Sequence, residues 1–325
     1  NVALRPRQPG SSFKPVVYAA AFMKGYTPET VLIDTETIFK AYPKDYSPKN
    51  YTGKEYGVVS FKKALAGSLN IAAVKVLYLT GVPKVLDLAD SLGYSTLADR
   101  SRFGLSLVLG GAEVKLLEHI AAFNTFAQDG VYRAPLAILN IEGQGSNVYP
   151  FLQPAGQSVM PPNIARTITS ILSDNDSRSF MFGPVNYLIL PDRLAAVKTG
   201  TTNDFHDAWT LGVTPSLATG VWVGNSDNKE MKKGADGSKI AAPIWQSFMK
   251  KALQGQPVEA FGKASLPLSP KPILRGLGLG EVEMEIDKAS GKRATSLTPE
   301  NFKIKKKLLV LHDILHYLDK DDPAG

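Results

Sequence analysis

The 325-residue chain contains no cysteine and only four histidines. The absence of cysteine excludes structural disulfides, thiolate-based zinc and iron–sulfur sites, and a cysteine nucleophile. The chain also lacks an apolar run of the length and continuity that a membrane span requires. An uncharged stretch close to that length, residues 208–226, is interrupted by Gly212, Pro215 and Gly220 and predicts a hairpin. Any histidine-dependent chemistry would have to use one of four residues.

The composition is that of a chain with a large buried core. Apolar residues make up 44% and charged residues 21% of the sequence, which excludes an intrinsically disordered chain. The length allows one large domain or two ordinary ones. The 37 basic and 30 acidic residues give a formal charge of +7. That balance would suit an anionic partner, but it is equally typical of a slightly basic protein without one.

Hydrophobic periodicity predicts helices, then strands, then a further helix. The expected helices cover residues 13–22, 60–66, 71–80, 82–92, 114–127, 164–172 and 242–253. The expected strands cover residues 194–197, 208–213 and 219–223, with a turn at Thr214-Pro215-Ser216. This order indicates an α+β fold.

The C-terminal part of the chain differs in composition from the rest. Residues 254–280 are rich in proline and glycine and predict a linker. We therefore expect one domain over residues 1–253, the linker over 254–280, and a small extension over 281–325. Within the extension, residues 281–295 predict a hairpin around Ser290-Gly291. A basic run and a short helix over 308–318 should follow.

The pattern Ser-x-x-Lys can pair a hydroxyl nucleophile with an amine base. It occurs four times, as Ser11/Lys14, Ser60/Lys63, Ser226/Lys229 and Ser247/Lys250. Ser60 is placed to cap a helix, and the last two pairs lie in a polar loop and on a solvated helix face. Lys14 alone stands at the start of a helix that is apolar on all sides. Burial there would lower its pKa and make it a base for Ser11.

Two other patterns place polar residues beside apolar segments. Ser-x-Asn occurs at 68–70, 173–175 and 226–228, and the last two match a helix end leading into a loop and a turn after a strand. Ser68 and Asn70 instead interrupt an apolar helical region, where buried polar groups need partners. Lys198-Thr199-Gly200 occurs once, at the end of a predicted strand, and its glycine would let a ligand backbone approach closely. Standing alone, this triplet would indicate only a strand end and a turn.

Together, the three patterns resemble the motif set of penicillin-recognising serine enzymes, in the order Ser11-x-x-Lys14, Ser68-x-Asn70, Lys198-Thr199-Gly200. The flanking residues sharpen the resemblance. Residues 7–15, 68–74, 109–114, 198–204 and 207–209 look like the transpeptidase domain of class A, bifunctional, penicillin-binding proteins. The resemblance covers about residues 1–253. Residues 287–294 are similar to the segment that follows this domain in such proteins.

The resemblance implies a penicillin-binding/β-lactamase-like fold, an antiparallel sheet with helices on both faces. Family members carry further sheet strands before the nucleophile, and a membrane-anchored glycosyltransferase domain before those. We therefore expect this chain to lack the N-terminal strands of its sheet, the glycosyltransferase and the anchor. The resemblance also implies action at the extracytoplasmic face of the bacterial cytoplasmic membrane.

The family motifs imply a role for each matching residue. Ser11 would attack the penultimate D-Ala carbonyl of a stem peptide, and Lys14 would take its proton. Ser68 would relay a proton to the leaving amine, and Asn70 would bind the substrate backbone. The Thr199 and Thr201 hydroxyls would bind the substrate carboxylate, with Lys198 supplying positive potential. Gly200 would belong to the substrate-binding residues by letting the substrate backbone approach the strand. The backbone N–H groups of Ser11 and Thr201 would form the oxyanion hole.

The resemblance implies D-Ala-D-Ala stem peptides and β-lactams as partners, with no nucleic acid, cofactor or metal. His312 and His316 are spaced as a metal pair would be, but the sequence supplies no evident third ligand. His119 is expected at the edge of the core.

Three alternatives stay open. A D,D-carboxypeptidase differs only in using water as the acceptor. A serine β-lactamase needs a base for deacylation, and the chain contains no Glu-x-x-Leu-Asn of the class A type. The third is a catalytically idle β-lactam sensor or scaffold.

Overall fold

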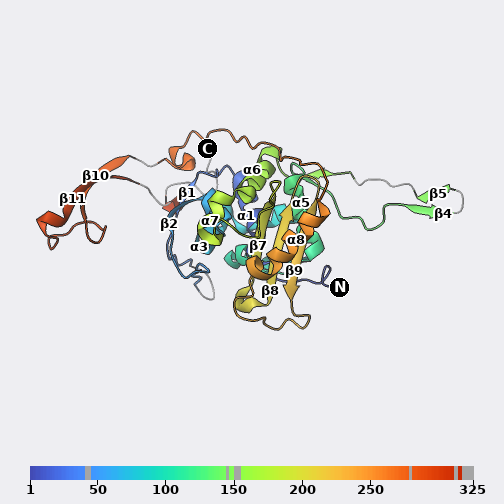
Figure 1. Cartoon of the computed structure of the whole chain (residues 1–325). Coiled ribbons are helices and arrows are strands. Elements are labelled where there is room, and N and C mark those ends of the chain that lie inside the picture. Colours follow the sequence, from blue (N-terminus) through green and yellow to red (C-terminus); the bar gives the residue numbers. More distant parts are fainter. Residues whose placement is uncertain (41–44, 144–145, 150–154, 278–279, 311–313, 317–325) are drawn as a thin grey trace.

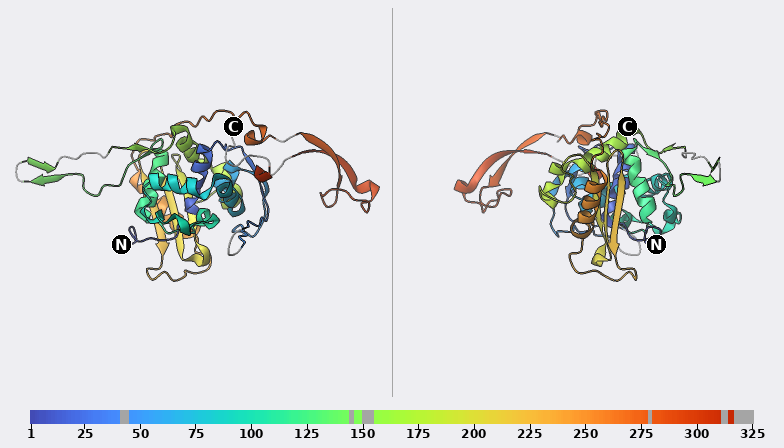
Figure 2. Two further views of the ribbon diagram at one scale, coloured as in Figure 1. Left: turned by 180° about the vertical axis from the view of Figure 1, so that it is seen from behind. Right: turned by 45° about the vertical axis from the view of Figure 1, so that its right-hand side comes forward.

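The computed structural model describes residues 1–325 except 41–44, 144–145, 150–154, 278–279, 311–313 and 317–325. At its centre is an antiparallel sheet in the order β7-β8-β9 (Figure 1). Its strands are β7 (Ala196–Thr201), β8 (Asp207–Val213) and β9 (Ala218–Gly224). Helix α5 (Leu116–Ala127) covers one face and α8 (Ala242–Ala252) the other, as the right-hand view of Figure 2 shows. This arrangement confirms the predicted α+β fold.

Helix α1 (Lys14–Met23) lies at the centre of the helical part of the molecule (Figure 1). Its residues 14–22 are all buried, as expected for a helix that is apolar on every side. Pro15 is tolerated because it stands in the first turn, where no helical hydrogen bond is lost. The helices around α1 are α2 (Phe61–Ala66), α3 (Asn70–Thr80), α4 (Val82–Ser91) and α6 (Pro162–Ser173).

Two local predictions about this part of the chain have different outcomes. The predicted cap at Ser60 is confirmed, because its Oγ accepts a hydrogen bond from Lys63 N at 3.2 Å. The pattern at 173–175 was expected to be a helix end leading into a loop, and only the first part is confirmed: α6 ends at Ser173, but a second helix follows in place of the loop. This helix is α7 (Asn175–Phe182), and the Asp174 carboxylate caps it by accepting from Ser177 N at 3.0 Å.

The strand that carries Lys198 extends further than its apolar residues predicted. The expected strand covered 194–197, whereas β7 begins at Ala196 and continues to Thr201. Lys198-Thr199-Gly200 therefore lies inside the strand and not at its end. The ladder to β8 explains the extension, since Lys198, Thr199 and Gly200 pair with Leu211, Thr210 and Trp209. The predicted turn after β8 is confirmed by a hydrogen bond from Thr214 N to Leu217 O at 2.8 Å.

Short strands away from the main sheet form two-stranded ribbons. β1 (Val31–Asp34) pairs with β2 (Gly57–Ser60), and neither was predicted, because four residues are too few to establish a pattern. β3 (Val131–Tyr132) pairs with β6 (Gln157–Ser158), and β4 (Ile141–Gly143) with β5 (Ser146–Tyr149). The β4–β5 ribbon extends away from the body of the molecule, on the side opposite to β10 and β11 (Figure 1).

The extension folds differently from the prediction. β10 (Glu281–Asp287) pairs with β11 (Lys303–Leu309) along its whole length, which was not predicted. The predicted hairpin is confirmed only next to its turn, where Asp287 N donates to Lys292 O and Ala294 N to Glu285 O, each at 2.8 Å, and Ile286 bridges Arg293. Acidic residues of β10 face lysines of β11 across this ribbon, and opposite charges favour the longer-range pairing. The predicted helix over 308–318 is wrong where described: 308–309 belong to β11, and Ile314–His316 form a 3₁₀ turn. Residues 311–313, including His312, and 317–318 lie outside the described residues.

Both the predicted linker and the extension contact the main core. Leu274 lies in a 3₁₀ turn (Pro272–Arg275) and is fully buried, and its carbonyl oxygen accepts hydrogen bonds from the Thr27 and Thr30 hydroxyls. Ile314 is also buried in this core. The boundaries 1–253, 254–280 and 281–325 stay predictions. In the described part of the chain, no helix combines the length and apolarity needed to cross a bilayer.

Candidate active site

The fold brings the three sequence patterns together at one cleft of about 800 Å³. They come from the turn before α1, the loop before α3, and strand β7. The predicted residues that line the cleft are Ser11, Ser68, Asn70, Thr199 and Thr201. Lys14 and Lys198 are buried, and both contact Ser68 at the wall of the cleft. The competing Ser-x-Asn patterns at 173–175 and 226–228 are not among the described residues that line it.

Ser11 lies in a 3₁₀ turn, Gly10–Phe13, that packs directly against β7. Gly10 has a φ of +55°, and a Cβ atom there would stand 2.4 Å from Thr201 O. A Cβ on Gly200 would stand 2.2 Å from Pro9 O. Both glycines are therefore needed for the turn to lie this close to the strand. Gly200 was expected to admit a ligand backbone, but the close approach in the structure is made by the protein's own Pro9 carbonyl.

Ser12 does not cap α1, the helix that follows it. The first turn of α1 has no side-chain cap, and Ser12 Oγ instead lies 2.7 Å from Pro9 O and 2.8 Å from His119 Nε2. His119 was predicted at the edge of the core and is in fact fully buried. Its ring lies edge-on to Trp209 and bonds to the Tyr94 hydroxyl, so partners on other elements bury it.

The Lys14 amine is surrounded by oxygen atoms of the Ser68–Asn70 segment. Its Nζ lies 2.7 Å from both Ser68 O and Asn70 Oδ1, 3.3 Å from Leu69 O, and 3.4 Å from Ser68 Oγ. The Ser68 hydroxyl therefore lies within hydrogen-bond distance of Lys14. Burial, together with the positive charge of Lys198, holds the pKa of Lys14 well below its ordinary value. The carboxylate of Asp34 acts in the opposite direction.

The Ser68 hydroxyl lies between two lysine amines. Lys198 Nζ is 2.8 Å from Ser68 Oγ and 2.8 Å from Thr199 O. Burial, and after it the charge of Arg178, lowers the pKa of Lys198 to about 7. The two lysines and the hydroxyl therefore form a continuous path along which protons can move near neutral pH.

Two residues that hold the Ser68–Asn70 segment were missed by the sequence analysis. Asn50 Oδ1 caps α3 by accepting from Asn70 N at 2.7 Å and Ile71 N at 3.2 Å. Asn50 Nδ2 donates to the buried carboxylate of Asp34 at 2.6 Å, and that carboxylate also accepts from Ala72 N. Asp34 lies in the short strand β1 and Asn50 in a loop, and neither segment has a periodic pattern that could have identified them.

Thr201 is oriented so that its hydroxyl proton can point into the cleft. Its Oγ1 accepts a hydrogen bond from Gly237 N at 3.0 Å, so the hydroxyl proton is left to donate to another group. A Cβ on Gly237 would stand 2.3 Å from Trp209 O and 2.5 Å from Gly200 O. The absence of a side chain at Gly237 therefore allows the loop after β9 to approach β7 and to hold Thr201.

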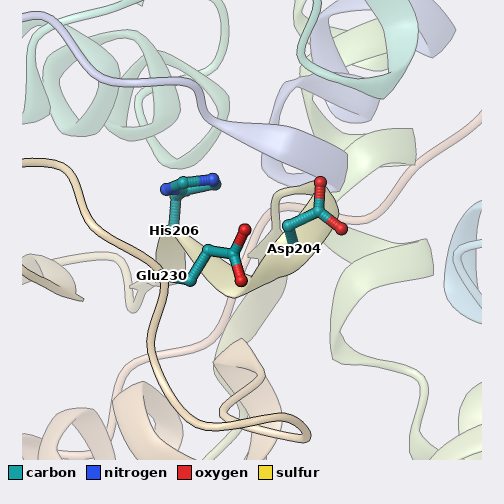
Figure 3. A group of neighbouring side chains, drawn as sticks. All are labelled: Asp204, His206 and Glu230. Atoms are coloured by element: carbon teal, nitrogen blue, oxygen red, sulfur yellow. The ribbon is translucent and has the colours of Figure 1, made fainter.

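A mixed group of metal-ligating residue types stands near the cleft at the β7–β8 turn. The ligand atoms of Asp204, His206 and Glu230 all lie within 4.8 Å of one another (Figure 3). Asp204 lines the cleft, and His206 Nδ1 is bonded to Asn228 O at 2.7 Å. Both carboxylates are exposed, and exposed acidic groups often gather without an ion. We therefore assign no metal to this group.

The comparisons with known proteins agree with this geometry. Residues 2–250 match the family model of the penicillin-binding protein transpeptidase domain. Penicillin-binding protein 1A of Aquifex aeolicus is 37% identical over 260 residues, covering 78% of this chain and 34% of that protein. The homologue from Neisseria cinerea is 32% identical over 257 residues, covering 77% and 32%. The chain thus spans about a third of the length of these relatives.

Solved structures show the same fold. PonA1 of Mycobacterium tuberculosis superposes with a TM-score of 0.72 at 25% identity, covering 82% of this chain and 73% of that one. Penicillin-binding protein 1A of Haemophilus influenzae superposes with a TM-score of 0.71 at 24% identity, covering 95% of this chain and 49% of that one. The match over residues 2–250 includes all three motifs that meet at the cleft. With a serine turn, two buried lysines and this family match, the chain belongs to the penicillin-binding protein transpeptidase domain family of serine acyltransferases.

Proposed function

We propose that this domain crosslinks peptidoglycan stem peptides as a D,D-transpeptidase, through an acyl-enzyme on Ser11. The observation that carries this proposal is the Ser68 hydroxyl within hydrogen-bond distance of both buried lysines, in the cleft that Ser11 lines. An arrangement of this kind can take a proton from a nucleophile and deliver it to a leaving amine.

In the proposed reaction, Ser11 Oγ attacks the carbonyl carbon of the penultimate D-Ala, and its proton passes to Lys14. The N–H groups of Ser11 and Thr201 bind the oxyanion. The C–N bond then breaks, and Ser68 relays the proton to the amine of the departing D-Ala. An amine of a second stem peptide attacks the ester, gives up a proton and releases Ser11. Lys198, Thr199 and Thr201 bind the terminal carboxylate.

A solved relative supports the β-lactam partner in this proposal. PonA1 of Mycobacterium tuberculosis has been solved in complex with penicillin V at 25% identity to this chain. We therefore propose β-lactams as covalent inhibitors that react at Ser11, and D-Ala-D-Ala stem peptides as substrates. The site of action would be the extracytoplasmic face of the bacterial membrane. In the full-length protein, an upstream glycosyltransferase domain would act beside this one.

The test is to incubate the purified chain with a stem pentapeptide and a D-amino acid as acceptor, and to identify the products by mass spectrometry. We expect D-Ala release together with the peptide carrying the acceptor in its place. Hydrolysed tetrapeptide alone would favour the carboxypeptidase. Sustained nitrocefin turnover beyond one equivalent would favour the β-lactamase. A penicillin adduct without any D-Ala release from the peptide would favour the idle sensor.

Two substitutions of Ser68 distinguish the effect of its hydroxyl on acylation from the effect of its backbone conformation on stability. Ser68 has a φ of +59°, which is unfavourable for any residue with a side chain. Ser68→Ala should slow penicillin acylation by about 10²-fold, because the link between the two lysines is lost. Ser68→Gly should slow acylation equally, yet be more stable to unfolding than Ser68→Ala by about 1 kcal/mol. Stopped-flow acylation and urea unfolding measure the two effects. Unimpaired acylation in both variants would contradict a proton relay through Ser68.

A further inference from the structure

A buried histidine that the proposed mechanism does not use lies directly behind the nucleophile turn. His119, on α5, has no exposed surface. Its Nε2 lies 2.8 Å from Ser12 Oγ, and its Nδ1 lies 2.6 Å from the Tyr94 hydroxyl. Ser12 is the residue next to the nucleophile. Burying a polar side chain costs free energy of desolvation, which hydrogen bonds to buried partners offset.

The proton on each atom of this chain of bonds can be assigned. Pro9 O can only accept, so the Ser12 hydroxyl, 2.7 Å away, donates its single proton there. His119 Nε2 must then donate to Ser12 Oγ. Burial lowers the pKa of His119 to about 3, so the neutral ring carries no second proton at pH 7. Its bare Nδ1 accepts from Tyr94, and burial raises the pKa of that phenol well above its ordinary value.

All the bonds therefore run in one direction, from Tyr94 through His119 and Ser12 to the Pro9 carbonyl. Aligned bonds of this kind strengthen one another in a buried setting. They end on the turn that holds Ser11. Pro9 O also accepts from Ser12 N at 3.2 Å, and it lies against the Cα of Gly200 on β7. The preceding carbonyl, Gln8 O, accepts from Trp209 Nε1 at 2.7 Å.

We propose that His119 is a positioning residue for acylation, which holds the Ser11 turn against β7 by fixing the Ser12 hydroxyl. An apolar side chain at 119 would leave both Ser12 Oγ and the Tyr94 hydroxyl short of a partner in a fully buried place. The turn would then have additional conformations, and Ser11 would occupy its attacking position less of the time. Small displacements of a nucleophile are costly, because reaction requires near-attack geometry.

The inference rests on the proposed acylation at Ser11, and its test is the kinetics of penicillin acylation. His119→Leu should lower the first-order acylation rate constant by about 10- to 100-fold. The half-saturating penicillin concentration should change by less than about twofold, because the turn positions the nucleophile and does not bind the ligand. His119→Gln with Tyr94→Phe restores a donor to Ser12 and removes the orphaned hydroxyl. It should recover the rate to within about fivefold of the parent.

A double-mutant cycle asks whether His119 acts through Ser12. Ser12→Ala should slow acylation to a similar extent, and His119→Leu in that background should add little further loss. Thr125→Val is the matched control: Thr125 is also buried on α5, but among the described residues its hydroxyl bonds within the helix alone, to Ala121 O. This variant should acylate at the parent rate. Thermal unfolding of every variant, measured in parallel, identifies losses that come from stability alone.

A spectroscopic readout does not depend on catalysis. In ¹⁵N NMR of histidine-labelled protein, one imidazole should show the neutral form protonated at Nε2, and it should not titrate between pH 5 and 8. That signal should disappear in His119→Leu. Parent-like acylation by a folded His119→Leu would overturn the inference, as would additive losses in the cycle. If the parent itself forms no adduct with penicillin, the proposed function fails and not this inference alone.

Discussion

Ser11→Ala should abolish covalent labelling by penicillin. Removing the nucleophile of a serine acyltransferase costs on the order of 10⁶ in rate. A fluorescent penicillin followed by gel imaging measures the loss, and peptide mass spectrometry of the parent locates the adduct. Trypsin should yield the peptide 8–24, because cleavage after Lys14 is blocked by Pro15. This peptide also holds Ser12, so fragmentation must assign the added mass to Ser11.

A matched control for this prediction is Ser60→Ala, which removes the serine of another Ser-x-x-Lys pattern. Ser60 Oγ accepts from Lys63 N and caps α2, so its loss should lower the free energy of unfolding by about 1 kcal/mol. The acylation rate should stay at the parent value. An adduct on Ser60, Ser226 or Ser247, or labelling that survives Ser11→Ala, would show that the nucleophile has been assigned to the wrong pattern.

Lys14→Arg should reduce acylation almost to the level of Ser11→Ala, although it preserves a positive charge. A guanidinium does not lose its proton in proteins, so it cannot act as a base. A neutral lysine can: its two N–H bonds match the two acceptors at 2.7 Å, Ser68 O and Asn70 Oδ1. The lone pair is then left for the Ser11 proton. Stopped-flow acylation at several penicillin concentrations separates the rate constant from binding.

The pH dependence follows from the directions of the two lysine pKa shifts. Acylation needs neutral Lys14, so its rate constant should rise with pH along a limb centred well below 10.5. Carboxylate binding needs charged Lys198, whose pKa is about 7, so the half-saturating penicillin concentration should increase above that pH. A rate constant that falls with pH, or a half-saturating concentration that falls above pH 7, would contradict the roles given to Lys14 and Lys198. An arginine variant that acylates at a substantial fraction of the parent rate would exclude Lys14 as the base.

The same shifts predict the sign of the change in stability with pH. Both lysines have a lower pKa in the folded chain than in the unfolded chain, which binds more protons between the two values. The free energy of unfolding should therefore increase with pH through this window, which for Lys198 runs from about 7 to 10.5. In Lys198→Met, this contribution should disappear.

Local chemistry explains what could be predicted from the sequence. The helix after Ser11 is apolar on every side, so its burial, and with it the burial of Lys14, follows from composition alone. Ser60 was identified as a cap because capping depends on residues three apart in the chain. The three motifs in their order were sufficient for the family. The first two inferences use residues that are close together in the sequence. The third uses three short motifs whose residues and order are all present in this chain.

The tertiary structure decided how those residues act together. The Ser68 hydroxyl contacts Lys198, which lies 130 positions away in the sequence. Hydrophobic periodicity cannot predict a contact between residues so far apart. Asn50 and Asp34, which hold the Ser68–Asn70 segment, come from a loop and a four-residue strand without any pattern. His119 was expected at the edge of the core, and only folding placed it in the interior with Ser12 and Tyr94 on either side. The pairing of β10 with β11 was missed for the same reason, since pairing between distant strands depends on which charges meet in space.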